Sequence, residues 1–209
     1  SSAGGSIDMG GWVSFKGTSV EDYRIRLLLA NLEIQIMEGL TLRASTLKNG
    51  LVLSPGKKRD LPFIGGDIEI SNFKYTKDIH IIEVSDLNVA GFGERRRRTK
   101  RPRLFDKSKD VFEYDIRLHG DKNIAIMNNL LDARLRIDDK EEPLRLVGTN
   151  QTFGFLGSVL SKSGEVRFAG KTFDIRNAYV TFKDPLRPDN PYFRVTADVD
   201  VRDWKITIT

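Results

Sequence analysis

The chain has 209 residues, with 34 lysines and arginines against 29 aspartates and glutamates, giving a net charge of +5. It contains no cysteine, which excludes disulfide bonds and thiolate metal sites. No apolar run approaches the ~18 residues that suggest a membrane-spanning helix. The length suits one domain, or one piece of a longer repetitive β protein.

The positive charge is concentrated in a basic run at residues 94–103, within a polar insertion predicted at residues 90–110. Removing the seven basic residues of this run leaves 27 basic against 29 acidic residues, so the rest of the chain is nearly neutral. A solvated, disordered loop is the first interpretation of the run, and contact with an anionic membrane or an acidic partner is the second. Nucleic acid comes last, because no aromatic side chains interleave with the run.

The N-terminal part begins with Ser-Ala-Gly-rich residues 1–6, which have the composition of a cloning remnant and are set aside. We treat residues 7–209 as a single domain. Apolar and polar residues then alternate in short runs, as at Tyr23–Leu29, which is typical of β-strands. Turns are predicted at Glu38-Gly39 and at Asn49-Gly50, the latter as a two-residue hairpin.

The C-terminal part, residues 163–209, shows the strictest alternation. Val166 and Phe168 alternate with charged residues, and Phe173 and Ile175 do the same. Further strands are predicted at residues 79–89, 111–118, 123–127, 130–137, 142–147 and 152–160. About sixteen short strands and no helix predict an all-β fold. Short connections favour sequential antiparallel neighbours, and so long a sheet must curl to hide its apolar face.

The order of elements in this part resembles a known family. It runs Gly-x-Val-x-Phe-x-Gly from Gly164, then Phe173-x-Ile175, Val180-x-Phe182, Asp184-Pro185, and a last Trp-x-Ile-x-Ile strand from Trp204. This set is similar to the C-terminal domain of TamB-like proteins, which belong to the AsmA-type, bridge-like lipid transfer proteins of the bacterial envelope. The resemblance covers residues 111–209 and implies an elongated, curled antiparallel sheet forming a U-shaped hydrophobic groove, the β-taco.

The candidate site is the apolar stripe, as the lining of a lipid groove. An acyl chain in such a groove gains about 0.8 kcal/mol for each buried methylene. The residues expected to face inward are Ile116, Leu118, Ile124, Ile126, Leu135, Ile137, Leu144, Leu146, Phe153, Phe155, Val166, Phe168, Phe173, Ile175, Val180, Phe182, Phe193, Val195, Ala197, Val199, Ile206 and Ile208. A bulge near Gly154 or Gly157 would reverse the face of its neighbours.

Sites for catalysis or cofactors are not predicted. Gly170-Lys171-Thr172 resembles the end of a P-loop, but the earlier glycine and the following helix are missing, which favours a hairpin turn. His80 and His119 are the only histidines and lie far from any acidic cluster in the sequence. The acidic segment 138–142 lacks the pattern of a calcium loop. We therefore expect no enzyme, metal or cofactor.

The resemblance implies a periplasmic position within an inner-membrane-anchored protein of a diderm bacterium, with a membrane at both ends of the full-length protein. Its implied role is a conduit for phospholipid acyl chains between the inner and outer membranes. The alternative is an interaction or chaperone scaffold that assists an outer-membrane Omp85-type barrel through β-augmentation. A polysaccharide-cleaving enzyme would need carboxylates converging in a cleft, which the sequence does not assemble.

Overall fold

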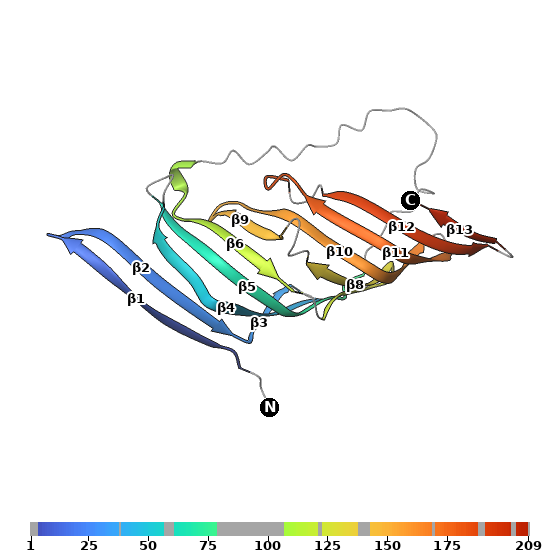
Figure 1. Ribbon diagram of the computed structural model, residues 1–209, viewed down its shortest axis with the longest axis horizontal. Helices are drawn as coiled ribbons and strands as arrows, with labels where there is room; N and C mark the ends of the chain where they lie inside the picture. Colours follow the sequence, from blue (N-terminus) through green and yellow to red (C-terminus); the bar gives the residue numbers. More distant parts are fainter. Residues whose placement is uncertain are drawn as a thin grey trace.

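The fold is a single curled β-sheet in a computed structural model, which describes residues 4–37, 39–56, 61–78, 107–120, 123–137, 143–168, 170–187, 191–201 and 204–208. Within these residues, thirteen strands form the sheet, whose arrangement is drawn in Figure 1. They are β1 (Ser6–Lys16), β2 (Ser19–Ala30), β3 (Leu32–Met37), β4 (Leu40–Pro55), β5 (Pro62–Tyr75), β6 (Glu113–His119), β7 (Ile124–Met127), β8 (Leu131–Ile137), β9 (Arg145–Thr149), β10 (Phe153–Phe168), β11 (Lys171–Phe182), β12 (Tyr192–Val201) and β13 (Trp204–Ile208). The helical element of the described residues is a short 3-10 turn, η2 (Lys107–Lys109).

The strand order is β1-β2-β4-β5-β6-β9-β10-β11-β12-β13, with β3, β7 and β8 beside this path. The long strands β5 and β10 flank two pairs of short strands, and we call β5 and β10 the two rails. Between them, β6 and β9 pair with each other in one tier, and β7 and β8 pair in a second tier. Each rail therefore carries two short strands placed end to end along one of its edges.

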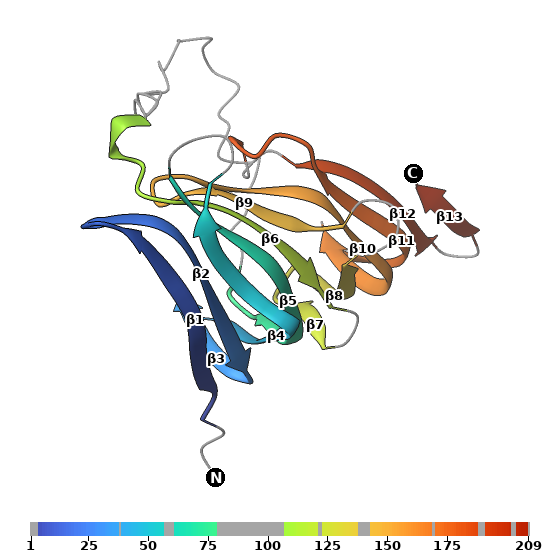
Figure 2. The ribbon, with the colours of Figure 1, turned by 60° about the vertical axis from the view of Figure 1, so that its left-hand side comes forward.

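The sheet curls along its length, and β1 and β13 lie at opposite ends of the molecule (Figures 1 and 2). This confirms the predicted all-β curled sheet. The sheet is mixed, however, because β5 pairs in parallel with both β6 and β7. A parallel pair needs a long crossover, and the chain between Tyr75 and Glu113 is long enough to supply one. We expected antiparallel neighbours throughout, because the other connections are short.

Two predicted breaks between strands are wrong, which lowers the number of strands among the described residues by two. Asn49-Gly50 is not a hairpin turn: β4 continues through it, with a register shift against β5 between Thr46 and Leu51. Likewise, β10 runs through residues 161–164 with a register shift against β8. In both places a bulge absorbs the irregularity, and the strand goes on.

Other turns agree with the sequence. Gly39, with φ of 77°, joins β3 to β4, and Gly170, with φ of 71°, joins β10 to β11. An Asx turn follows β7, in which Asn128 Oδ1 accepts hydrogen bonds from the backbone nitrogens of Leu130 and Leu131 at 3.0 and 2.9 Å. The predicted strand at residues 79–89, most of the polar insertion and the acidic segment 138–142 lie outside the described residues.

Candidate functional site

The candidate site is one face of the sheet, which we call the apolar face. Cross-strand partners share a face, and the register therefore links the predicted residues from strand to strand. Ile116 pairs with Leu146, and Leu146 pairs with Phe155. Farther along, Val159 pairs with both Ile137 and Val180. Strand by strand, these pairings and the alternation place the predicted lining residues on the apolar face, except Phe168 and Ile208, whose side chains are not described.

The face does not reverse near Gly154 and Gly157. Pairing between β10 and β11 runs without a shift from Gly157 to Ser161, although Gly157 has a φ of 105°. Phe155 packs at 5.5 Å, centroid to centroid, against Phe182 of β11. Phe153 and Phe155 therefore belong to the same face as Val159 and Phe182.

The middle of the apolar face is its most buried part. Six buried side chains form its core: Leu51, Ile116, Leu118, Ile124, Ile137 and Leu144. Half-buried side chains from β2, β5, β6, β8, β9, β10 and β11 pack against them. Even so, no large side chain of the described residues is fully buried. A single curled layer packs its apolar side chains against one another but leaves part of their surface open.

Both ends of the apolar face are exposed. Toward β13, Phe193 of β12 and Ile206 of β13 are 69% and 45% exposed, although Ala197 and Val199, also on β12, are buried. Toward β1, Met9 is 73% exposed, and its partner Leu27 belongs to the side chains packed on the core. The apolar face thus continues beyond its buried middle toward both β1 and β13, as exposed apolar side chains.

The N-terminal third of this face is missing from the predicted set. Ile7, Met9 and Val13 of β1 pair with Leu29, Leu27 and Tyr23 of β2. From β5, Ile64, Ile68, Ile70 and Phe73 also pack against the core. The signal was present, because residues 23–29 and 66–70 alternate as clearly as the C-terminal strands.

The opposite face is polar and carries ion pairs across strands. Arg145 donates two hydrogen bonds to the Asp115 carboxylate, one of them from Nε to Oδ1 at 2.9 Å. These bonds raise the pKa of the Arg145 guanidinium, against a smaller lowering by burial. Asp67 Oδ1 lies 2.9 Å from His119 Nε2 and 3.4 Å from an Arg117 guanidinium nitrogen. His119 thus takes part in a charged network between β5 and β6.

The segment Gly170-Lys171-Thr172 forms a hairpin end, since Phe168 pairs with Lys171 and a strand follows instead of a helix. Within the described ranges, no three His, Cys, Asp or Glu side chains come close enough together to hold a metal ion. His80 and the basic run lie outside these ranges. None of the described helical residues forms a helix long and apolar enough to cross a membrane.

A curled sheet with one apolar and one charged face defines a class of amphipathic β proteins. The chain matches the TamB C-terminal domain over residues 1–209, and it therefore belongs to the TamB family. Membership makes it a protein of the bacterial envelope, in a family linked to an outer-membrane assembly module. No match is found among curated proteins.

Proposed function

We propose that the apolar face is a lipid-transfer conduit, which shields phospholipid acyl chains as they pass through the periplasm between the inner and outer membranes. The observation that supports it best is the continuity of the face: buried in the middle, it extends as exposed apolar side chains toward both β1 and β13. A face required only for folding would gain stability by burying these side chains.

Energetics favour movement along such a surface. Each methylene removed from water contributes about 0.8 kcal/mol, so an acyl chain leaves the bilayer only for an environment that is equally apolar. Because the bilayer and the apolar face are both hydrocarbon-like, transfer between them is nearly neutral in free energy. Passage then needs neither a covalent step nor a cofactor, and we propose that the protein is not an enzyme.

Lipid uptake by the purified protein tests the proposal. We expect phospholipid to co-purify and to be visible by native mass spectrometry, and a fluorescent fatty acid to bind saturably. Phe193→Asp places a charge at the exposed end of the apolar face and should reduce uptake several-fold. Arg194→Asp alters the polar face at the next residue of β12 and is the matched control.

Circular dichroism and urea unfolding establish that both variants keep the fold. A folded wild-type protein that carries no lipid and takes up no fatty acid would contradict the proposal. So would equal uptake by Phe193→Asp and Arg194→Asp.

A second candidate is a scaffold that binds an Omp85-type barrel by β-augmentation. Within the described sheet, β1 pairs only with β2 and β13 only with β12, so each has an edge that can accept a strand. Deleting residues 204–209 should then abolish barrel assembly in cells, while Phe193→Asp should be tolerated. The conduit proposal predicts that Phe193→Asp is the damaging change.

A further inference from the structure

A second candidate site lies away from the apolar face, where β3, β4, β5 and β7 meet. It is a pocket with a volume of about 630 Å³, lined by polar side chains together with Phe73, Ala125 and Met127. Arg43 and Asn72 pair across β4 and β5, and Lys74 pairs with Thr41 on one side and Ala125 on the other. The side chains of these residues alternate with Phe73, which packs on the core, so they lie on the polar face. We call this the asparagine pocket, after Asn31, Asn72 and Asn123 in its lining.

The pocket carries two cationic side chains. Arg43 makes an ion pair with Glu33 at 2.8 Å, through one terminal nitrogen of its guanidinium. Lys74 has no ion-pair partner in the described part of the chain, and it is exposed. A lysine and an arginine against a single carboxylate leave the pocket with a positive charge available to a ligand.

An unpaired donor also points to a ligand. Arg43 Nε is buried and has no hydrogen-bond acceptor among the described residues. Buried side-chain donors of this kind nearly always have a partner, and leaving a charged one unpaired is costly. A small shift of the Arg43 side chain toward the pocket would let this N–H donate to a negatively charged oxygen atom bound there.

The asparagines add neutral donors. Asn31 and Asn123 are the two non-glycine residues of the described chain with positive φ, at 50° and 55°, and both line the pocket. Asparagine tolerates this left-handed backbone better than most residues do. No described residue forms a hydrogen bond with the side-chain amide of Asn31, Asn72 or Asn123, so the donors of all three remain available to a ligand.

We propose that the asparagine pocket binds a phosphate group. Guanidinium, ammonium and amide donors converging on one pocket match the acceptor oxygens of a phosphate, and the cations favour an anion over a neutral sugar. The volume falls in the range of pockets that hold small organic ligands, so the phosphate would carry an ester substituent. A phospholipid head group and a soluble phosphomonoester share this chemistry, and the site does not depend on the lipid conduit.

Titration followed by NMR of the backbone amides tests the site. The probes are inorganic phosphate, glycerol 3-phosphate and a short-chain phosphatidylglycerol below its micellar concentration. We expect saturable shifts at the amides of Asn72, Lys74 and Asn123. Binding of glycerol 3-phosphate alone would support a soluble phosphomonoester, and tighter binding of the phosphatidylglycerol would support a lipid head group.

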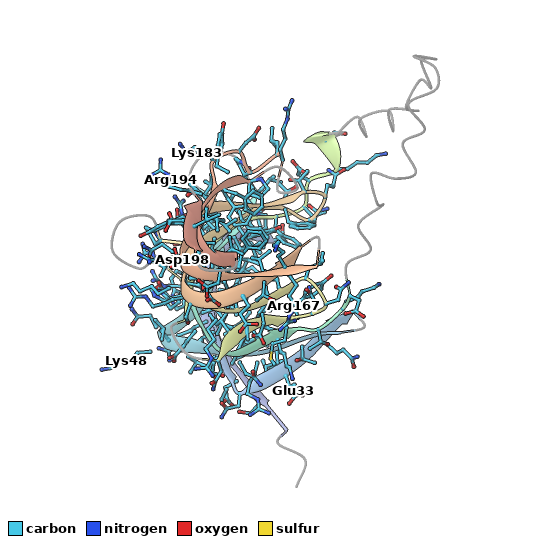
Figure 3. The ribbon with its side chains drawn as sticks, turned by 90° about the vertical axis from the view of Figure 1, so that its right-hand side faces the viewer. Glu33, Lys48, Arg167, Lys183, Arg194 and Asp198 are labelled. Carbon is cyan, nitrogen blue, oxygen red and sulfur yellow. The ribbon has the colours of Figure 1, made fainter. Side chains whose placement is uncertain are left out.

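Three variants make the result decisive. Lys74→Glu reverses a charge in the pocket and should weaken binding at least about tenfold, since hydrogen bonds to charged groups are the stronger ones. Asn123→Gly keeps a backbone that glycine adopts freely while removing the amide, and should weaken binding several-fold. Lys48→Glu makes the same charge change at an exposed residue of β4, well separated from Glu33 in Figure 3, and should change binding less than twofold.

The proposal is overturned if no probe gives saturable shifts at these amides. It is also overturned if Lys48→Glu weakens binding as much as Lys74→Glu does, because the effect would then be one of net charge. Loss of lipid uptake in the Phe193→Asp variant leaves this titration unaffected, so the two proposals succeed or fail separately.

Discussion

The middle and the ends of the apolar face have the same residue chemistry but different burial. Ile137 in the middle is 4% exposed, and Phe193 near one end is 69% exposed, although the pairings place both on one face. The middle of the sheet supplies the six side chains of the buried core and most of the half-buried side chains that pack against it, whereas Phe193 lies outside this cluster. Alternation therefore specifies which face a side chain takes, while packing against neighbouring side chains decides whether water reaches it.

The middle and the ends of the apolar face also differ in what they contribute to the protein. The buried middle supplies the cohesion of the fold, and the exposed ends supply apolar surface that is open to a ligand. Residues at the ends can consequently be changed at little cost in stability, which makes function and folding experimentally separable.

The largest expected effect tests this separation directly. Ile137→Ala should lower the free energy of unfolding by about 3 kcal/mol, because it opens a cavity in the middle of the face. Phe193→Ala removes a larger side chain but should cost less than about 1 kcal/mol, since most of that ring already contacts water. Urea unfolding measures both values. Equal losses would show that the end is as tightly packed as the middle.

A smaller effect should show what holds the C-terminal end together where apolar burial is weak. Asp198 is buried on the polar face, where it accepts hydrogen bonds from Arg176 Nε at 2.6 Å and Thr207 Oγ1 at 2.7 Å. It thus links β11, β12 and β13. Asp198→Ala should cost about 2 kcal/mol, because the three strands lose two hydrogen bonds to a buried, charged acceptor.

Asp200→Ala is the control for this change, since Asp200 is exposed on the same strand and should cost less than about 0.5 kcal/mol. Similar unfolding curves for the two variants would mean that the carboxylate of Asp198 does not tie the strands together.

The smallest effect concerns a half-buried residue of the middle. Burial raises the pKa of Tyr114, whose hydroxyl donates to the Thr152 carbonyl oxygen at 3.0 Å. The folded state thus favours the neutral phenol. This contribution to stability is complete below the ordinary pKa of about 10 and is lost as the pH rises through the folded-state value.

Ultraviolet titration of the wild type against Tyr114→Phe should show one tyrosine that ionises above the ordinary value. A difference spectrum centred at or below pH 10 would show that the phenol is as well solvated as in a free peptide.

The amphipathic strands and the face that each side chain takes could be predicted from alternation alone, whereas the elongated, curled shape came from the family resemblance. The period of two places residues such as Ile116, Val180 and Val199 correctly, because it depends only on local backbone geometry. Strand pairing is different: the parallel contact of β5 with β6 joins segments separated by a long connection, and nothing local in the sequence encodes it. Glycines such as Gly50 were ambiguous for another reason: glycine is typical of both a β-bulge and a turn.

The asparagine pocket could not be predicted at all. Asn31, Arg43, Asn72 and Asn123 come from four separate stretches of the chain, and only the pairing of β3, β4, β5 and β7 brings them together. No motif links them in the sequence. Exposed asparagines near turns are also common, so their type alone carries no signal.

The way in which β5 and β10, the two rails, are connected affects how the sheet responds to local opening. β5 and β10 are held apart by two separate hydrogen-bonded ladders, β6 with β9 and β7 with β8. If one ladder opens, the other still fixes the spacing of the rails. The distance between β5 and β10 is therefore fixed by two strand pairs. Local opening of one pair should change this distance less than it would if a single pair joined the two strands.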